Sequence, residues 1–341
     1  MRKALSLACF IAAMLALPGL APAQIPSYSA EDLQAAITRA EEYRRKAAYF
    51  DGAAYFPSEW EAAETRYAEA RNMPTTSVIE TNQAATTFTL AADSFASIFR
   101  LSVFLYAQAR EDEIMMIRDR LVAAGARAIF PSLMAPADQI ALAALGQYEA
   151  SDYHAARDLA AQAYAMFQTL ETAFDAWQMR REIIQRGFTS YAASNYTAAE
   201  EMIAAAVHAY LAGEFPRAME NAKEAQARYS LVLSAGWAAV ADYHYTSADT
   251  ERIAAMEVRA NIAASGLFEQ AESIRNEAIE LLHAERFREA AQQLADAEAL
   301  YLVARVSTLE SRRIAAEAIR KANRQIEEAI NAAQRASINE N

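Results

Sequence analysis

Four segments of the chain share one spacing of aromatic residues and alanines, and this pattern constrains the fold more than any other feature. In each segment an aromatic residue is followed by alanines three and ten positions later and by a second aromatic residue after fourteen. The segments are Tyr153, Ala156, Ala163 and Phe167; Tyr196, Ala199, Ala206 and Tyr210; Phe215, Ala218, Ala225 and Tyr229; and Phe287, Ala290, Ala297 and Tyr301. Separations of three, four and seven residues place side chains on one helix face. The pattern therefore predicts helices that pack closely through their alanines.

A short polar turn precedes each leading aromatic residue. These turns are Ala150-Ser151-Asp152, Ser194-Asn195, Gly213-Glu214 and Glu285-Arg286. Each unit is thus predicted to be a helix, a tight turn and a second helix. The chain has only 8 Gly and 8 Pro among 341 residues, so breaks are few and helices are long. Its many alanines and few β-branched residues argue against an all-β sandwich or a Gly-rich phosphate-loop enzyme.

The best-matching turn resembles the tetratricopeptide repeat. It reads Ala212-Gly213-Glu214-Phe215-Pro216-Arg217-Ala218, with Ala222 and Ala225 following, and Leu145-Gly146 before Tyr148 resembles the first-helix signature of that family. The resemblance covers about Pro136 to Val303. It implies an all-α, TPR-like solenoid of αα-hairpins with a concave surface that binds peptides or protein elements. The leading aromatic residues are 43, 19 and 72 residues apart, whereas the family repeats every ~34 residues.

The N-terminus has the organisation of a secretory signal peptide. Arg2 and Lys3 precede the apolar run 4–17, and Ala21-Pro22-Ala23 offers small residues for cleavage. We expect cleavage after Ala23 and a mature N-terminus at Gln24, which changes the formal charge from −12 to −14. The alternative is a lipoprotein acylated at Cys9, the only cysteine, although Ser6 stands where such a signal places leucine.

Long helices are also predicted on both sides of the repeats. Pairs with capping-box spacing are Ser29 with Asp32, Ser58 with Glu61, and Ser77 with Glu80. The first helix should end near Phe50 and the third before Gly125. Pro131 and Pro136 mark the best boundary. The predicted parts are the signal peptide 1–23, an N-terminal helical section 24–130, αα-hairpin repeats 131–304 and a C-terminal capping helix 305–341.

The apolar stretch Thr86–Tyr106 is expected to be a buried helix, because Asp93 and Arg100 within it are costly in a bilayer. We therefore expect no transmembrane helix after signal cleavage. The mature chain is acidic and its basic residues are dispersed, which argues against a nucleic-acid partner.

Catalytic and metal-binding motifs are not evident in the sequence. The histidines His154, His208, His244 and His283 are far apart and form no two-histidine helix motif. The acidic run Glu111-Asp112-Glu113 does not have the alternating ligands and glycine of a calcium loop. We therefore expect no enzyme activity, no cofactor and no metal, with a metal site formed by folding as the alternative.

Aromatic residues between the third and fourth segments indicate a contact surface. Trp237, Tyr243 and Tyr245, together with His244, crowd a stretch in which the repeat spacing is broken. Trp and Tyr are favoured where an apolar surface meets a partner. Core packing is the alternative for these residues. The stripe of alanines and isoleucines along 305–335 predicts a cap on the last hairpin, with a coiled-coil partner site as its alternative.

These features favour a periplasmic or outer-membrane-associated scaffold or adaptor that binds an envelope protein. Two alternatives remain open. Exported tetratricopeptide proteins include accessory subunits of solute transporters, which hold a small ligand. The signal peptide, acidic Ala-rich helices and tyrosine content also resemble, weakly, the spirochaete treponemal membrane protein B type, which implies a structural envelope antigen.

Overall fold

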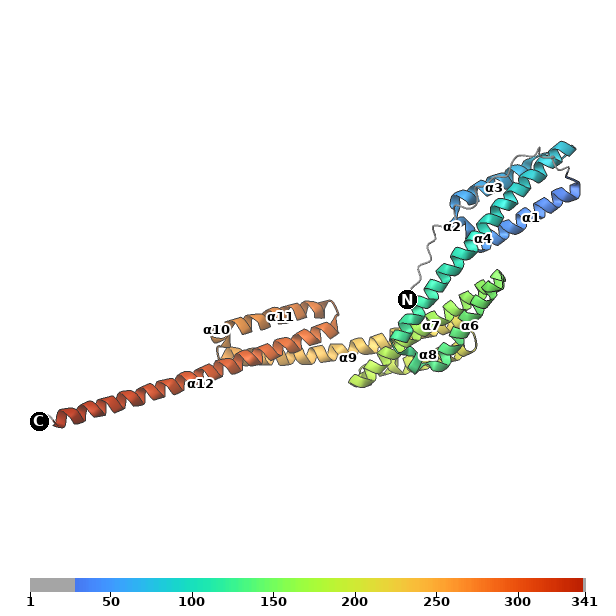
Figure 1. The fold of residues 1–341 in the computed structure, drawn as a ribbon. Coiled ribbons are helices and arrows are strands. Elements are labelled where there is room, and N and C mark those ends of the chain that lie inside the picture. Colours follow the sequence, from blue (N-terminus) through green and yellow to red (C-terminus); the bar gives the residue numbers. More distant parts are fainter. Residues whose placement is uncertain (1–27, 340–341) are drawn as a thin grey trace. The chain divides into compact units, whose positions relative to one another are not determined.

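The structure is a computed structural model that describes residues 28–339. In this range it is all-α, as predicted, and contains no strand. The helices are α1 (Ala30–Tyr49), α2 (Gly52–Tyr55), α3 (Pro57–Asn72), α4 (Val78–Ala123), α5 (Ala126–Ile129), α6 (Pro131–Glu149), α7 (Tyr153–Arg186), the 3-10 helix η2 (Phe188–Ser190), α8 (Ala193–Leu211), α9 (Phe215–Glu257), α10 (Ala260–Ala263), α11 (Ser265–His283) and α12 (Phe287–Asn339). Figure 1 shows their order along the chain. The predicted signal peptide, with Cys9 and Gln24, lies outside the described residues.

The described chain divides into two compact units. The first contains the residues up to Glu113 together with Gly146–Asp158, and the second contains Ile114–Leu145 and the residues from Leu159 onward. Helices α4, α6 and α7 each contribute to both units, so the division falls within helices and not at the prolines. Pro131 is the first residue of α6, and Pro136 lies inside that helix.

Helix starts in the first unit follow from side-chain capping. The Ser29 hydroxyl accepts a hydrogen bond from the backbone N–H of Asp32, and the Asp32 carboxylate accepts one from the backbone N–H of Ser29. Glu80 accepts in the same way from the backbone N–H of Ser77, at 2.9 Å. Both predicted boxes are confirmed. The Ser58 box is wrong, because α3 begins at Pro57 after Phe56 and has no side-chain cap.

Alanines on α1 and α3 form the core of the first unit against aromatic residues of α4. Phe95 of α4 is fully buried and meets Trp60 of α3 edge-on, with 5.3 Å between ring centroids. Phe88, about two turns earlier, meets Tyr67 in the same manner at 5.6 Å. The small alanine side chains allow the three helices to lie side by side (Figure 1).

Helix α4 contains a stretch long and apolar enough to cross a membrane, judged by length and composition alone. In the structure 44% of that stretch is buried within the protein. Phe88 and Phe95 face the core, whereas Leu101 and Phe104 are about half exposed. Asp93, on the exposed side, pairs with Arg39 of α1 at 2.7 Å. Helix α4 is therefore packed in the core on one side and exposed on the other.

Three of the four predicted turns are confirmed. Ser151, Gly213 and Glu285 all adopt positive φ, and each is followed two residues later by the first residue of a long helix. The fourth is wrong, since Asn195 lies inside α8. The chain turns earlier, at Gly187, whose φ of 71° favours glycine. Tyr196 therefore lies within a short middle helix, whereas Tyr153, Phe215 and Phe287 open α7, α9 and α12.

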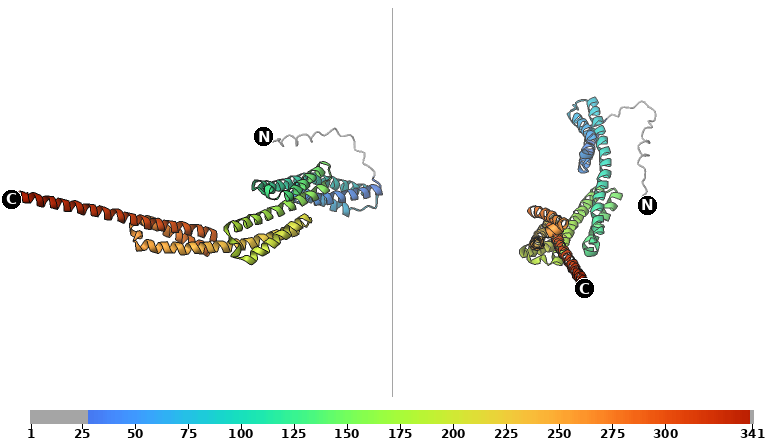
Figure 2. Two further views of the ribbon diagram at one scale, coloured as in Figure 1. Left: turned by 90° about the horizontal axis from the view of Figure 1, so that it is seen from below. Right: turned by 90° about the vertical axis from the view of Figure 1, so that its left-hand side faces the viewer.

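Each long helix of the second unit contributes to two successive cores. On α9, Tyr229 packs in a cluster with Ile183 of α7, while Ala255 packs in another cluster with Tyr301 of α12. Between these, Ala241 of α9 packs with residues of α11 and α12. The first part of α9 thus packs in a core with α7, and its last part packs in a core with α12 (Figure 2).

Helix α12 is continuous from Phe287 to Asn339. The boundary predicted at 304/305 therefore falls inside it, because no glycine or proline interrupts the sequence there. Its first part packs against α9 and α11, with Tyr301 and Thr308 buried. All residues from 309 to 334 are exposed, so this part does not shield the last hairpin as predicted.

Candidate protein-contact surface on helix α9

All four residues that the sequence indicated for partner contact lie on α9, within about two turns. Trp237, His244 and Tyr245 are half-buried and have contacts within the chain. Tyr243 is at the surface, with 66% of the residue exposed. The structure brings Tyr243 and His244 into edge-on ring contact, with centroids 5.1 Å apart. Trp237 and Tyr245 instead pack against one core cluster of α9, α11 and α12.

Two guanidinium groups lie close to the ring of Trp237. The Arg186 and Arg288 groups lie over its ring at 4.2 and 5.1 Å from the centroid. Its indole N–H donates to Glu182 at 3.2 Å, and Arg288 also donates to that carboxylate. The ring edge meets Phe188 with centroids 5.6 Å apart. This tryptophan therefore joins α7, η2, α9 and α12 and is covered by them.

Gly236, the residue before Trp237, permits this packing. A Cβ atom at residue 236 would lie 2.3 Å from Cδ2 and 2.4 Å from Cγ of Phe188. Those separations are far below van der Waals contact, so only glycine lets the Phe188 ring lie against α9.

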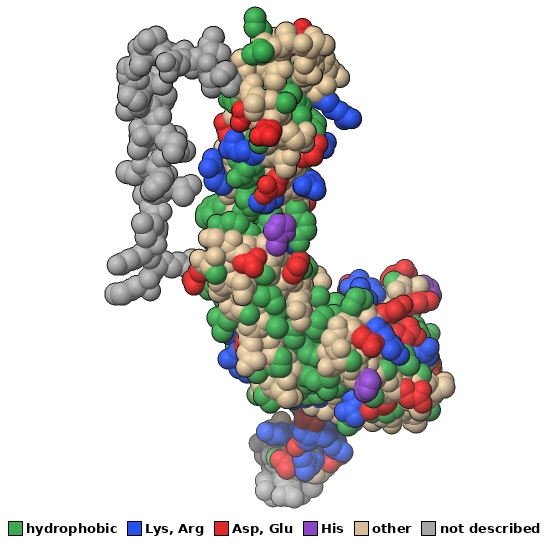
Figure 3. Space-filling view, turned by 90° about the vertical axis from the view of Figure 1, so that its right-hand side faces the viewer, with side chains coloured by type: hydrophobic (Ala, Val, Ile, Leu, Met, Phe, Trp, Pro, Cys, Tyr) green, Lys and Arg blue, Asp and Glu red, His purple; other side chains and the backbone are tan. Residues whose placement is uncertain are grey.

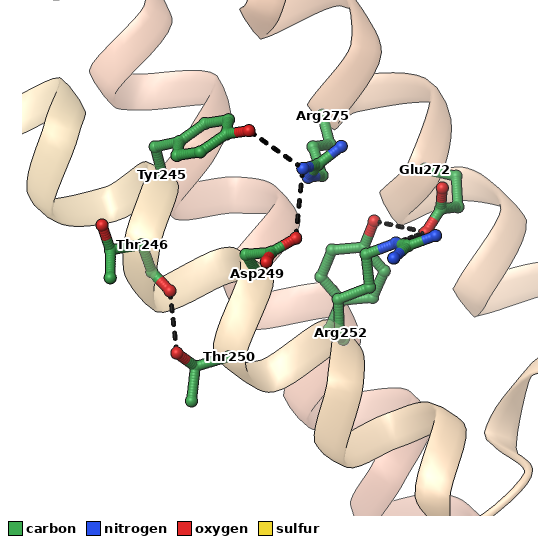
Figure 4. Close-up of polar contacts among 8 residues, drawn as sticks. Tyr245, Thr246, Asp249, Thr250, Arg252, Glu272 and Arg275 are labelled. Carbon is green, nitrogen blue, oxygen red and sulfur yellow. Dashed lines mark hydrogen bonds and ion pairs between the residues drawn. The ribbon is translucent and has the colours of Figure 1, made fainter.

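Tyr245 is bound by Arg275 of α11. The Arg275 guanidinium donates to the Tyr245 hydroxyl at 3.4 Å and to Asp249 at 3.1 Å, and it lies over the Tyr245 ring (Figure 4). Arg275 thereby fastens α11 to two successive turns of α9.

His244 and Ser247 both bind Glu298 of α12, each through a different carboxylate oxygen. The separations are 3.0 Å for His244 Nδ1 and 2.6 Å for Ser247 Oγ. The hydrogen bond from Ser247 holds the pKa of Glu298 below its usual range, against the opposing effect of burial and with help from His244. Because both side chains of α9 bind one carboxylate of α12, the trio fastens the two helices together.

Tyr243 lies on an exposed face of α9 that is bordered by the exposed Asp242. Thr246, Thr250 and Ile253 follow it at separations of three, four and three residues, which place all four on one side of the helix. Ile253 is 51% exposed. The Thr250 hydroxyl donates to the Thr246 carbonyl at 2.8 Å, and both threonines point away from α11 (Figure 4). We call these four residues the α9 face; it is about 15 Å long.

Sequence reasoning did not identify the ion pairs that fasten neighbouring helices. Four arginines each donate through Nε to a carboxylate 20 residues later: Arg44 to Glu64, Arg118 to Asp138, Arg180 to Glu200 and Arg252 to Glu272. The last two carboxylates also accept a tyrosine hydroxyl, from Tyr229 at 2.6 Å and from Tyr301 at 2.9 Å. The recurring separation of 20 residues is the signal that would have identified them.

These hydrogen bonds determine the ionisation of the two glutamates. Burial alone would raise the pKa of Glu272, but hydrogen bonds from Arg252 and Tyr301 outweigh it and lower the pKa (Figure 4). The same balance lowers the pKa of Glu200 beside Arg180 and Tyr229. Burial raises the pKa of both tyrosines, so their hydroxyl groups remain protonated donors.

The remaining polar surface shows no concentrated charge on the side visible in Figure 3. Acidic and basic side chains alternate there with apolar ones. Between residues 28 and 339 no three His, Cys, Asp or Glu side chains come together in a way that could hold a metal ion. An open depression of about 430 Å³ between α11 and α12 is lined mainly by polar residues, among them Glu277, Glu280 and Arg286.

A scan against protein-family models and searches of curated proteins and of solved structures gave no match to this chain.

Proposed function

We propose that the protein is an exported, non-catalytic scaffold of the cell envelope that binds a protein partner through the α9 face. The observation that carries this proposal is the exposed strip from Tyr243 to Ile253, on a helix that Arg275 and Glu298 fasten to α11 and α12. Interfaces are enriched in tyrosine and depleted of charge at their centres. Export to the periplasm or the outer membrane rests on the signal-like N-terminal sequence.

The fastened sides of α9 support a binding role because they keep the strip in one conformation. Arg275 and Glu298 bind α9 from α11 and α12, close to Tyr243. A preorganised surface loses little conformational entropy when a partner binds. We also infer a TPR-like helical repeat, since the arginine–carboxylate pairs recur at a fixed separation in four successive helix pairs.

Capture of the partner from envelope extracts tests the proposal. The exported protein should recover a protein in fixed stoichiometry. Tyr243→Asp combined with Ile253→Asp should reduce recovery at least tenfold, because a hot-spot contact contributes ~2 kcal/mol or more. Leu211→Asp on α8, a residue 68% exposed, is the matched control and should leave recovery unchanged.

Circular dichroism should show equal helicity for all variants, since none of these residues is buried. Trp237 and Tyr245 are unsuitable targets, because their replacement would disturb packing. Unchanged capture by the double variant would remove the α9 face as the binding site. Native mass spectrometry that finds a tightly bound small molecule and no protein partner would favour a ligand carrier instead.

A further inference from the structure

The exposed part of α12 carries an apolar stripe that resembles a packed helix face. Its residues are Ala315, Ile319, Ala322, Ile326, Ala329 and Ala333, which we call the α12 seam. They alternate at separations of four and three residues, the spacing of a coiled coil. Ile319 is 61% exposed and Ile326 is 57% exposed. Among the described helices of the second unit, none lies beside this part of α12 in either view of Figure 2.

The seam continues a row that is buried earlier in the same helix. Leu294, Tyr301 and Thr308 lie seven residues apart and are buried against α9 and α11. The same step leads to Ala315, Ala322 and Ala329. Helix α9 has three alanines with this spacing, Ala241, Ala248 and Ala255, and all three are fully buried. Within this protein, alanines at seven-residue steps are thus a face that another helix covers.

Charges are confined to the opposite side of the helix. Six charged residues lie between Ala315 and Ala333, namely Glu317, Arg320, Lys321, Arg324, Glu327 and Glu328. At about 100° per residue, all six project away from the seam. The seam face is uncharged over about 27 Å. A helical partner could therefore cover it without burying an ion.

We propose that two copies of the protein pair through the α12 seam as antiparallel helices, with the two-fold axis at Arg324. This arrangement places Ala322 opposite the partner's Ile326 and Ile319 opposite the partner's Ala329. Each of these layers combines one isoleucine with one alanine, so a single interhelical distance suits them all. The outermost layer pairs Ala315 with the partner's Ala333.

A parallel, in-register pair does not have this complementarity. Ile319 and Ile326 would each face their own copies, whereas Ala322 would face an alanine. Layers of two isoleucines would then alternate with layers of two alanines, and no single interhelical distance would suit both.

Light scattering on the purified chain tests the association. The expected mass is twice the mass of one chain. Ile319→Asp combined with Ile326→Asp should give monomers at concentrations where the parent is dimeric. Ile314→Asp is the matched control, because Ile314 is 55% exposed on the same helix but lies off the seam. This variant should remain dimeric. A parent chain that is monomeric at all concentrations up to 100 µM, roughly the upper limit for a weak dimer, would overturn the proposal.

Disulfide formation tests the orientation in a Cys9→Ser background, which has no other thiol. Ala322→Cys and Ile326→Cys are made as separate variants. Neither should form a disulfide dimer alone, but an equimolar mixture should cross-link, because only the antiparallel pair places the two positions opposite each other. Cross-linking of Ala322→Cys to its own copy would overturn the antiparallel arrangement.

Discussion

Replacement of Gly236 by alanine should destabilise the protein, although alanine is the better helix former. Gly236 lies in the interior of α9, where the change alone would stabilise by about 1 kcal/mol. The new Cβ, however, would lie 2.3, 2.4 and 2.8 Å from three atoms of the Phe188 ring. Cγ is the ring atom fixed to the side chain's own Cβ, so rotation of the ring cannot remove the overlap. Either η2 or α9 must move, and overpacking of this kind costs about 1–3 kcal/mol.

The matched control is Gly146→Ala in α6. A Cβ atom there would meet nothing within 4 Å, so only the gain in helix propensity should appear, about 0.5–1 kcal/mol. The two variants should therefore move the free energy of unfolding in opposite directions. Their difference, about 1–3 kcal/mol, measures the overlap with Phe188. Urea unfolding followed by circular dichroism gives both values.

A double-mutant cycle identifies the residue responsible. In a Phe188→Ala background the overlap is gone, so Gly236→Ala should become neutral or stabilising. Stabilisation by Gly236→Ala alone, to the same extent as Gly146→Ala, would refute the close approach of α9 and Phe188. An equal loss with and without the Phe188 ring would refute the assigned cause.

Three further predictions concern packing, pH and processing. Ala290→Leu should lower the free energy of unfolding by about 1–3 kcal/mol in urea titrations, whereas exposed Ala299→Leu should be within 0.5 kcal/mol, roughly, of the parent. The depressed pKa of Glu272 gives stability that is present above the unfolded pKa of about 4.5 and is lost as pH falls through the folded pKa. Tyr301→Phe should therefore cost about 1–2 kcal/mol at pH 7 and less at pH 3 by urea unfolding. Mass spectrometry of the exported protein should find Gln24 as the N-terminal residue, without lipid. An acylated Cys9 at the N-terminus would contradict this prediction.

Local signals in the sequence were sufficient to predict much of the fold. Serines three residues before an acidic residue correctly indicated the starts of α1 and α4. Short polar pairs before an aromatic residue correctly indicated the turns at Ser151, Gly213 and Glu285, and the structure shows that all three adopt positive φ. Asn195 failed because the polar character of Ser194-Asn195 is equally compatible with the first turn of a helix. The preceding Gly187 was the better signal.

The aromatic–alanine spacing could not separate a long helix from a short one. Tyr196 and Phe215 have the same following pattern, but only the second opens a helix shared by two cores. Spacing reports which face is buried and not how far the helix extends. The surroundings of Trp237 were equally hidden, because Glu182 and Arg288 reach it from positions 55 and 51 residues away in the sequence.

Because long helices such as α9 pack in two successive cores, the gene can change in length in a particular way. Arg180 and Arg252 hold the same position in successive helices, 72 residues apart. A deletion of 181–252 would join Arg180 directly to Ile253 within one uninterrupted helix, and Arg180 would then face Glu272 at the separation of 20 residues that the arginine–carboxylate pairs share. The junction lies within a helix and needs no new loop. Unequal recombination between such positions can therefore remove or add a whole 72-residue segment. The helices on either side of the junction would still form the arginine–carboxylate pair.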